Sequence, residues 1–581
     1  FTINGKMSKP EIISEFSNHF KSVLNKPGIE TVDNTKSNDQ LREILNHLPS
    51  NETDFYVSQS EVEEAIDQLN KDKTPDPFHI LSEHFIYARS KEFLQHITYL
   101  INRIFSGDTA PSLSLSVIIP LVKSNNKSLK DPNNYRGISI ISTLSKLLEV
   151  IIIGKCPTLK STHPSQFGFT NHSSTVHAEL LLQDTIKYYN QNGSPLYICS
   201  LDVAKAFDSC NWNTLFTKLL NRESTPKPIL KYLISSYLNS ESLVSYGGLK
   251  SNSFKLSQGV KQGSIISPHL FNLYTEDLLS EIRHSNQGTY LTDGTNMSVV
   301  AFADDLILIS PTLCGLQQLI DTCVRYGRSH NLKFNSTKSQ YLISVTSILP
   351  DNSIILNGER IESQDKLKHL GFLWKKSLSI LQLHSHLDYR ISEMWSVTAS
   401  LISGGVRYLH PNQIIDIYKT LVIPKLLYGL ELIKFKNYHW DQINRQARGA
   451  LKAMLGVSKH AKNHLHQLYK ISDIKVILYN RKMNLVNQML VNVNTRDYAL
   501  SVMALEKNDR TYSVVDEIND ICLENNINFL DCILNRKCHR IESFFPSESD
   551  EQLELKYCIE NWSNPDLRAK FRSILESAIP R

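Results

Sequence analysis

The sequence predicts an α+β protein made of several subdomains. A chain of 581 residues is too long for one hydrophobic core, so we expect roughly three or four subdomains. Between residues 116 and 373, short apolar runs typical of strands alternate with amphipathic helical stretches. From residue 380 onward the pattern is mostly helical.

Composition narrows the class of protein. Hydrophobic residues make up 41% of the chain and charged residues 21%, which is typical of globular proteins. The longest apolar runs, such as residues 147–153, are far too short to span a membrane, so no membrane partner is expected. The nine cysteines lie scattered without paired spacing, which favours a reducing compartment. Because the chain begins with Phe1 and shows no signal-peptide pattern, we expect an intracellular, non-secreted fragment of a longer protein.

The N-terminal part is expected to be helical with one break. Residues 11–24 form an amphipathic helix, and the polar residues 25–50 are expected to be a linker or loose loop. Ser58 and Glu61 have the spacing of a capping box, which begins the next helix.

Strands follow, with helices between them. Short apolar strands are expected at 117–122 and 135–141, and a helix at 142–153. Residues 196–203 alternate as a strand, and residues 296–310 form two short strands around a turn. Later helical stretches are expected at 313–329, 411–433 and 441–455.

Basic residues are concentrated in one part of the chain. Between residues 366 and 470 there are 16 Lys or Arg against 5 Asp or Glu, a local charge of +11. The whole chain has a net charge of +5, so the residues outside this segment have a net charge of −6. A basic block on an otherwise acidic chain indicates contact with a polyanion, and the alternative is a solvated helical face.

The strongest local pattern is a pair of adjacent carboxylates, Asp304 and Asp305, with apolar strand residues on both sides. Burying one ionised carboxylate without a partner costs several kcal/mol, and two adjacent ones also repel each other. A divalent cation would supply the missing positive charge. The sequence therefore predicts a metal site here, and the alternative is an exposed acidic turn.

Asp202 is the candidate for a further ligand because it lies at the end of the strand 196–203. It precedes Asp304 by 102 residues, so only the fold can bring the two together. Carboxylates at the ends of neighbouring strands would hold two Mg²⁺ ions, which activate a 3′-hydroxyl and stabilise a pyrophosphate leaving group. The alternative is that Asp202 caps the following helix.

Three segments, in order along the chain, resemble the motifs of one polymerase family. Residues 201–208 resemble motif A of reverse transcriptases, and residues 258–268 resemble motif B. Residues 301–305 are similar to motif C in the form common in non-LTR (LINE-type) retrotransposons. Residues 118–123 and 134–139 resemble the fingers strands of the same family.

The resemblance implies a right-hand polymerase fold, with fingers, a palm built on an antiparallel sheet and a helical thumb, plus a helical C-terminal extension. It covers roughly residues 8–470. The expected subdomains are an N-terminal helical extension at 1–102, fingers and palm at 103–375, a basic helical thumb at 376–472, and a C-terminal region of unknown role at 473–581.

By resemblance, Asp202, Asp304 and Asp305 are the catalytic carboxylates. Together with the carbonyl group of Val203 they would bind two Mg²⁺ ions, for which Mn²⁺ can substitute. Lys338 lies in a segment similar to motif D and is the candidate proton donor to pyrophosphate, with an ordinary solvated lysine as the alternative.

Five residues are expected to contact the incoming dNTP. Lys123 and Arg136 would bind its triphosphate, and the alternative is that they are plain surface residues. Phe207 would exclude a 2′-hydroxyl and so select dNTPs, unless it is a core aromatic. Gln262 and Gly263 would lie beside the nascent base pair, unless they only form a tight turn before a helix.

Further segments resemble parts that flank the catalytic motifs. Leu370 and Gly371 fall in a segment similar to the primer-grip hairpin, and the basic block after them takes the place of a thumb that tracks a template–primer duplex. Residues 166–169 resemble the block before motif A, although Thr170 stands where the family usually has Arg. The segment that runs from residues 16–20 through Pro75 and Asp76 resembles the stretch that these elements carry before the fingers.

Together these patterns favour an active RNA-directed DNA polymerase that copies retroelement RNA into DNA. Its expected partners are template RNA, a DNA primer and dNTPs, with an endonuclease domain upstream in the full-length chain, in a cytoplasmic ribonucleoprotein and the nucleus. One alternative is an RNA-templated RNA polymerase, which Ala303 and Phe207 disfavour. The other is a catalytically decayed or domesticated RNA-binding copy, which the three intact carboxylates disfavour.

Overall fold

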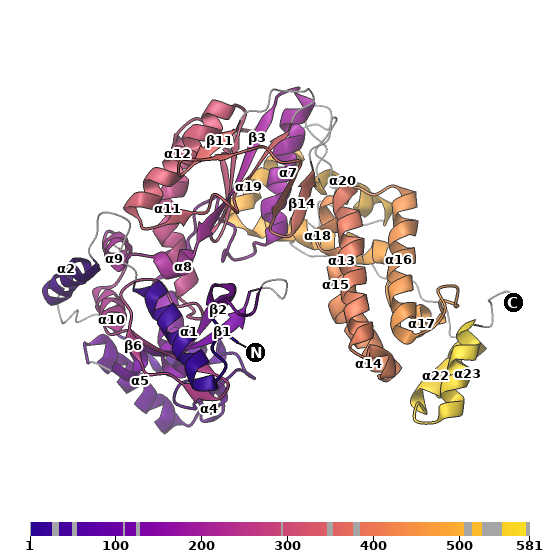
Figure 1. Ribbon diagram of the computed structural model, residues 1–581, viewed down its shortest axis with the longest axis horizontal. Coiled ribbons are helices and arrows are strands. Elements are labelled where there is room, and N and C mark those ends of the chain that lie inside the picture. The colour runs from indigo at the N-terminus through magenta and orange to yellow at the C-terminus, as the bar shows by residue number, and fades with distance from the viewer. Residues whose placement is uncertain are drawn as a thin grey trace.

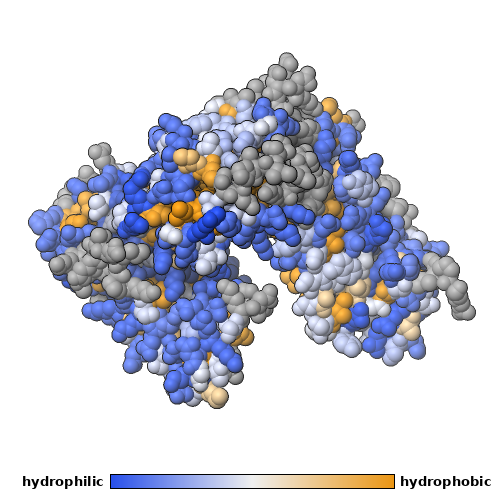
Figure 2. Space-filling model, turned by 45° about the horizontal axis from the view of Figure 1, so that its top comes forward, coloured by the Kyte–Doolittle hydropathy of each residue, from blue (hydrophilic) through white to orange (hydrophobic). Residues whose placement is uncertain are grey.

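The computed structural model describes residues 2–25, 34–48, 55–108, 111–123, 128–222, 224–291, 294–344, 353–375, 384–504, 514–525 and 549–576. The chain forms an arch (Figure 1): one arm holds the N-terminal helices and a first sheet, the top holds a second sheet, and the other arm is helical. In the space-filling view this face of the molecule is hollowed between the two arms (Figure 2). Within the described residues, no helix combines the length and the apolar character needed to cross a membrane.

The first arm contains a five-stranded sheet in the order β2–β1–β4–β5, with β6 on β4. β1 (Leu115–Val122) pairs antiparallel with β2 (Tyr135–Ile141) and parallel with β4 (Glu241–Tyr246). The strands expected at 117–122 and 135–141 are confirmed, whereas the sequence pattern did not indicate β4, β5 (Leu249–Lys250) or β6 (Phe254–Lys255).

Helices surround this sheet. The helix expected at 11–24 is confirmed, and the capping box of Ser58 and Glu61 begins α3. The helices of this arm are α1 (Lys9–Leu24), α2 (Asn34–His47), α3 (Gln59–Asp67), α4 (Ser82–Tyr87), α5 (Lys91–Phe105), α6 (Thr143–Lys155), α8 (Ala206–Ser209), α9 (Trp212–Leu220) and α10 (Lys227–Leu238).

The expectation of a linker at residues 25–50 is wrong, because most of that segment is helix α2. This helix packs against α9 and α10, and its Leu41 is fully buried. A mostly polar helix that packs through few apolar side chains has only a weak apolar stripe, so the polar composition of this segment did not predict a helix.

The top of the arch is an antiparallel sheet in the order β10–β3–β8–β7. Successive residues of its strands face opposite sides. Ile307 and Ile309 join the core on the α7 side, whereas Leu306 and Leu308 join the core on the α11 and α12 side. Both faces are therefore buried, and polar side chains are left to the strand ends. The elements are α7 (Thr175–Gln191), β3 (Leu196–Ala204), α11 (Ser267–His284), β7 (Val299–Phe302), β8 (Asp305–Ser310), α12 (Leu313–Ser329), β9 (Lys333–Phe334) and β10 (Gln340–Ser344).

The second arm follows two hairpins, β11 (Ile354–Leu356) with β12 (Glu359–Ile361), and β13 (Lys366–His369) with β14 (Phe372–Lys375). Its long helices α13 (His384–Ser403) and α16 (Asn437–Leu455) pack against each other. The stretch expected at 411–433 is not one regular helix, because α14 (Pro411–Ile417) passes through a π-helical turn into α15 (Ile423–Leu427). Pro424 accounts for this irregularity, since proline has no N–H for the α-helical bond.

The helices after residue 472 contact both the top of the arch and the second arm. Lys482 of α18 (Ile474–Val491) is fully buried, and its Nζ donates to the carbonyl of Ile433 (2.8 Å) and to Oε2 of Glu517 (2.6 Å). The hydroxyl of Tyr498 donates to Oδ2 of Asp184 in α7 (2.7 Å). Residues 474–504 and 514–524 thus brace the junction between the sheet and the helical arm. The remaining helices are α17 (His464–Leu468), α19 (Val493–Ala504), α20 (Val514–Glu524), α22 (Asp550–Glu560) and α23 (Pro565–Glu576).

Removing the Tyr498 hydroxyl should loosen this brace. Tyr498 and Asp184 are both buried, so Tyr498→Phe leaves a buried carboxylate short of one donor, at a cost of about 1.5 kcal/mol. Chemical denaturation of the purified chain measures the loss. Tyr557→Phe, on an exposed tyrosine, is the control, and equal midpoints for the two variants would contradict the bracing role.

Candidate active site

The pairing of β3 with β8 places Asp202 directly opposite Asp305. Side chains that oppose each other on antiparallel strands have Cβ atoms about 5 Å apart. Asp304 precedes Asp305 in the tight turn between β7 and β8. The expected meeting of two segments 102 residues apart is therefore confirmed, and the cap of α8 is Lys205 rather than Asp202.

The turn that carries Asp304 is held by Gln166. The Ala303 N–H donates to Oε1 of Gln166 (2.8 Å), and Nε2 of Gln166 donates to the Ala303 carbonyl (3.3 Å). Ala303 has a left-handed φ of 56°, and Gly168 packs so closely that a Cβ there would lie 2.2 Å from the Ala303 nitrogen. Sequence reasoning missed this positioning role, because it depends on a contact between positions 137 residues apart.

The site disfavours negative charge unless a cation is near. Burial, followed by the charge of Asp305, raises the pKa of Asp304 to about 6. Burial also raises the pKa of Asp305, while the nearby charges of His369, Lys338 and Arg136 act to lower it. Nζ of Lys338 lies 2.9 Å from Oδ2 of Asp202, so this lysine is an ion-pair partner of a candidate catalytic carboxylate.

Oxygen donors from the two strands suit a hard divalent cation. Within the described ranges, no three His, Cys, Asp or Glu side chains are grouped tightly enough to hold a metal by themselves. Mg²⁺ is usually bound by one or two carboxylates together with substrate phosphates and water, rather than by an all-protein cage. The opposed Asp202 and Asp305, with Asp304 beside them, fit that mode of binding.

A cavity of about 580 Å³ lies beside the carboxylates. Asp202, Asp304 and Lys338 line it from the second sheet and its turns, and Lys123 and Arg136 line it from the first arm. All five residues predicted to bind the dNTP line this cavity, namely Lys123, Arg136, Phe207, Gln262 and Gly263. Asp202, Val203, Asp304 and Lys338 line it too, whereas Asp305, Leu370 and Gly371 do not.

Phe207 is both a packing residue and a cavity residue. Its ring stacks on Phe271 with centroids 4.8 Å apart and planes 12° apart. Phe169 makes an edge contact with it at 6.2 Å. The two interpretations of Phe207 are therefore compatible, since its packing holds a half-buried ring at the cavity wall.

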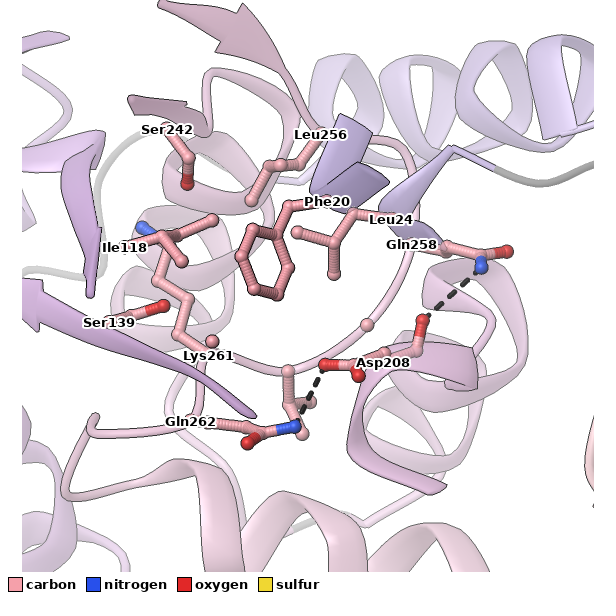
Figure 3. Close-up of a pocket in the computed structure, with 13 residues that line it drawn as sticks. Phe20, Leu24, Ile118, Ser139, Asp208, Ser242, Leu256, Gln258, Lys261 and Gln262 are labelled. Atoms are coloured by element: carbon pink, nitrogen blue, oxygen red, sulfur yellow. Dashed lines mark hydrogen bonds between the residues drawn. The ribbon is translucent and has the colours of Figure 1, made fainter. Parts of the chain in front are cut away.

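The loop before α11 is fixed from several sides (Figure 3). Nε2 of Gln262 donates to Oδ1 of Asp208 (3.0 Å), and the Gln262 carbonyl accepts from the Ser139 N–H (2.7 Å). Gly263 has a φ of 135°, and a Cβ there would lie 2.2 Å from the Ser139 carbonyl oxygen. The predicted tight turn is thus observed, and burial raises the pKa of Asp208 to about 6.

Glu149 of α6 holds the other end of this loop. This half-buried carboxylate accepts from the Ser264 hydroxyl (2.7 Å) and from the Ile265 N–H (2.7 Å). Burial raises its pKa. Sequence reasoning missed Glu149, although a lone acidic residue within an apolar helix was a usable signal.

The predicted primer-grip residues form the turn of the β13–β14 hairpin. Leu370 and Gly371 have left-handed φ values of 44° and 83°. The Tyr428 hydroxyl of the helical arm donates to the Leu370 carbonyl (2.7 Å). Glu179 of α7 accepts from Trp374 (2.8 Å) and bonds His369 (2.5 Å), so the hairpin is anchored to both the palm and the second arm.

Opposed carboxylates on an antiparallel palm sheet, beside a cavity with a basic wall, define the palm of a right-hand polymerase. Residues 123–374 match the family described as reverse transcriptase (RNA-dependent DNA polymerase). This region is therefore a reverse transcriptase domain. The proteins that it resembles are reverse transcriptases of non-LTR retrotransposons.

Three relatives illustrate the similarity. A Pol polyprotein from the type-1 retrotransposable element R2 of Popillia japonica is 25% identical over 63% of this chain and 51% of its own length. An RNA-directed DNA polymerase from the mobile element jockey of Drosophila funebris is 24% identical over 65% of this chain and 41% of its own length. A Pol polyprotein from the type-2 retrotransposable element R2DM of Drosophila melanogaster is 27% identical over 57% of this chain and 31% of its own length.

The chain thus spans about half or less of the length of these relatives. Among solved structures, an apo telomerase from Candida tropicalis gives a TM-score of 0.33 at 14% identity, over 53% of this chain and 63% of that one. A likeness of this size adds no support, so the fold assignment stands on the sheet, the site and the family match.

Proposed function

We propose that this chain is an RNA-directed DNA polymerase that extends a primer 3′-hydroxyl with dNTPs. The observation that supports the proposal best is the register of β3 and β8, which sets Asp202 opposite Asp305 at the edge of a basic cavity. A structural acidic pair would not need a third carboxylate or a cavity beside it. The family match of residues 123–374 supports the same chemistry.

The carboxylates are proposed to hold two Mg²⁺ ions, with Mn²⁺ as a substitute and the Val203 carbonyl as a further oxygen donor. Bound cations would activate the primer hydroxyl and neutralise charge on the leaving pyrophosphate. Lys338 is proposed to give a proton to pyrophosphate, since its ion pair with Asp202 already keeps its ammonium group at the reacting end of the cavity.

The other cavity residues are proposed to bind and select the nucleotide. Lys123 and Arg136 would bind the triphosphate, and Phe207 would block the position of a 2′-hydroxyl. Gln262 and Gly263 would support the nascent base pair from a loop that Asp208 and Ser139 hold in place. Because these contacts already order the loop, nucleotide binding loses no free energy in ordering it and can orient the substrate.

The remaining surfaces are proposed to hold the template and the primer. The segment 366–470 has an excess of basic side chains, and its described parts, residues 366–375 and 384–470, form the hairpin and much of the arm beside the hollow face. We propose that this arm binds the backbone of an RNA–DNA duplex and that Leu370 and Gly371 support the primer end. The relatives are longer than this chain, and two of them are named Pol polyproteins, so we propose that an endonuclease domain upstream in the full-length chain prepares the primer for this polymerase.

Primer extension on poly(rA)/oligo(dT) tests the proposal, with the full chain, Mg²⁺ and either dTTP or UTP. We expect dTTP incorporation, its loss on chelation with EDTA, and its return when Mg²⁺ is restored. Preference for UTP would indicate an RNA polymerase instead. Duplex binding without extension would indicate a decayed RNA-binding copy.

A further inference from the structure

We propose that His19 of helix α1 and Lys205 at the start of α8 bind the triphosphate of the incoming nucleotide. The N-terminal segment before the fingers would then complete the nucleotide site. This inference deepens the proposed function and rests on it.

Contacts with the sheet of the first arm fix the position of helix α1 and therefore that of His19. Phe16 is fully buried and makes an edge contact with Tyr135 at a centroid distance of 4.9 Å. Phe20 packs on β2 so closely that a Cβ on Gly137 would lie 2.7 Å from its ring. His19 sits between these anchors in sequence, so its backbone position follows from theirs.

The last turn of α1 is also tied to the loop that approaches the nucleotide. The Gln258 side-chain amide donates to the Val23 carbonyl (3.1 Å) and to the Asp208 carbonyl (3.2 Å). Figure 3 shows Phe20 and Leu24 of α1 on one side of a small cavity, with Asp208 and Gln262 at its other side. The helix is therefore packed into the site and is not a separate appendage.

His19 and Lys205 line the 580 Å³ cavity together with Lys123 and Arg136. The acidic residues Asp202, Asp208 and Asp304 line the same cavity, as does Lys338, which is paired with Asp202. Basic side chains and carboxylates around one cavity suit a ligand that has both an anionic tail and bound cations, which describes a nucleoside triphosphate with its divalent ions.

The charge state of His19 suits a neutral hydrogen-bond donor. Burial, followed by the charges of Lys205 and Lys123, lowers the pKa of its imidazole to about 4. The ring is therefore uncharged at neutral pH and can donate one N–H to a phosphate oxygen without adding to the repulsion between the lysines. All three side chains line the same cavity.

Lys205 owes its position to an unusual backbone conformation. Its φ of 52° is left-handed, which is uncommon for a residue other than glycine. The conformation turns the chain sharply between β3, which carries Asp202, and the short helix α8, which carries Phe207. Backbone strain of this kind is retained where the surrounding structure requires it, and here it keeps Lys205 at the cavity wall.

Single-nucleotide primer extension with the full chain tests the proposal. We expect His19→Ala and Lys205→Ala each to raise the KM for dTTP by about tenfold, with kcat changed by less than about threefold. The Kd for the template–primer duplex should stay as in the wild type. His19→Gln keeps an N–H donor and should recover much of the lost affinity. Lys21→Ala, on an exposed lysine of the same helix, is the matched control and should change nothing.

Binding of inorganic tripolyphosphate, measured by calorimetry on the same variants without divalent cations, gives a readout independent of polymerisation. Weaker binding in His19→Ala, but not in Lys21→Ala, supports the site even if the wild type fails to extend primers, in which case only the proposed function is lost. Normal extension with unchanged KM and unchanged tripolyphosphate binding in His19→Ala would overturn the inference and leave the proposed function intact. Weakened duplex binding with unchanged KM would also overturn it, because His19 would then contact the template.

Discussion

Asp304→Asn is expected to reduce primer extension by at least about 10³-fold while the protein stays folded and binds duplex normally. Asparagine keeps the size of the side chain and loses its charge. Asp304 lies in the turn that faces Asp202 and lines the cavity, so this charge acts where cations and phosphates would meet. Rapid-quench extension and a duplex-binding titration measure the two quantities.

The same substitution should leave the fold as stable as the wild type or make it more stable. Burial and Asp305 raise the pKa of Asp304 to about 6, so at neutral pH its ionised form opposes folding when no cation is bound. The neutral amide removes that penalty. We therefore expect a melting temperature of metal-free Asp304→Asn equal to or above that of the wild type.

Asp321→Asn is the matched control, because Asp321 is an exposed carboxylate on α12 of the same palm. It should leave extension and stability unchanged. A drop in the melting temperature of Asp304→Asn would make Asp304 a structural residue. Retained extension would remove it from the set of catalytic carboxylates.

Phe207→Ala is expected to lower the preference for dTTP over UTP by about 10- to 200-fold. The ring is stacked on Phe271 and flanked by Phe169, so it cannot move aside when a 2′-hydroxyl approaches. Alanine opens space for that hydroxyl. The ratio of kcat/KM for the two nucleotides, measured on one template–primer, gives the result.

A bulk-preserving variant separates steric selection from loss of packing. Phe207→Tyr keeps the ring and should keep the wild-type ratio, whereas Phe207→Ala should lose it. If both variants keep the ratio while the melting temperature of Phe207→Ala falls, the ring serves only as a core residue. In that case dNTP selection would have to come from another side of the cavity.

Much of the palm could be predicted from the sequence because its strands carry strong local patterns. The strand at 196–203 and the two strands around Asp304 are short, apolar and flanked by turns, and each was found close to its expected bounds. The helix α2 and the strands β4–β6 were not found. The first has few apolar positions, and the others are two to six residues long and are stabilised by neighbours distant in sequence.

The residues that support the site were also not identified in advance. Gln166, Glu149 and Asp208 each bond a backbone or amide group 50 or more residues away. The apolar helix around Glu149 signals that this carboxylate needs a partner, but the local sequence of none of the three residues shows which distant group that partner is. His19 is a similar case, since its neighbours Phe16 and Phe20 predict only an amphipathic helix.

The sequence by itself predicted a metal site, because two adjacent carboxylates between apolar strands are costly to bury unless a cation lies near them. Only the tertiary structure decided that Asp202 faces Asp305, that Lys338 pairs with Asp202, and that helix α1 reaches the cavity beside these carboxylates. The physical reason is that side-chain type and periodicity are local properties, whereas strand register and helix packing depend on which distant surfaces bury each other.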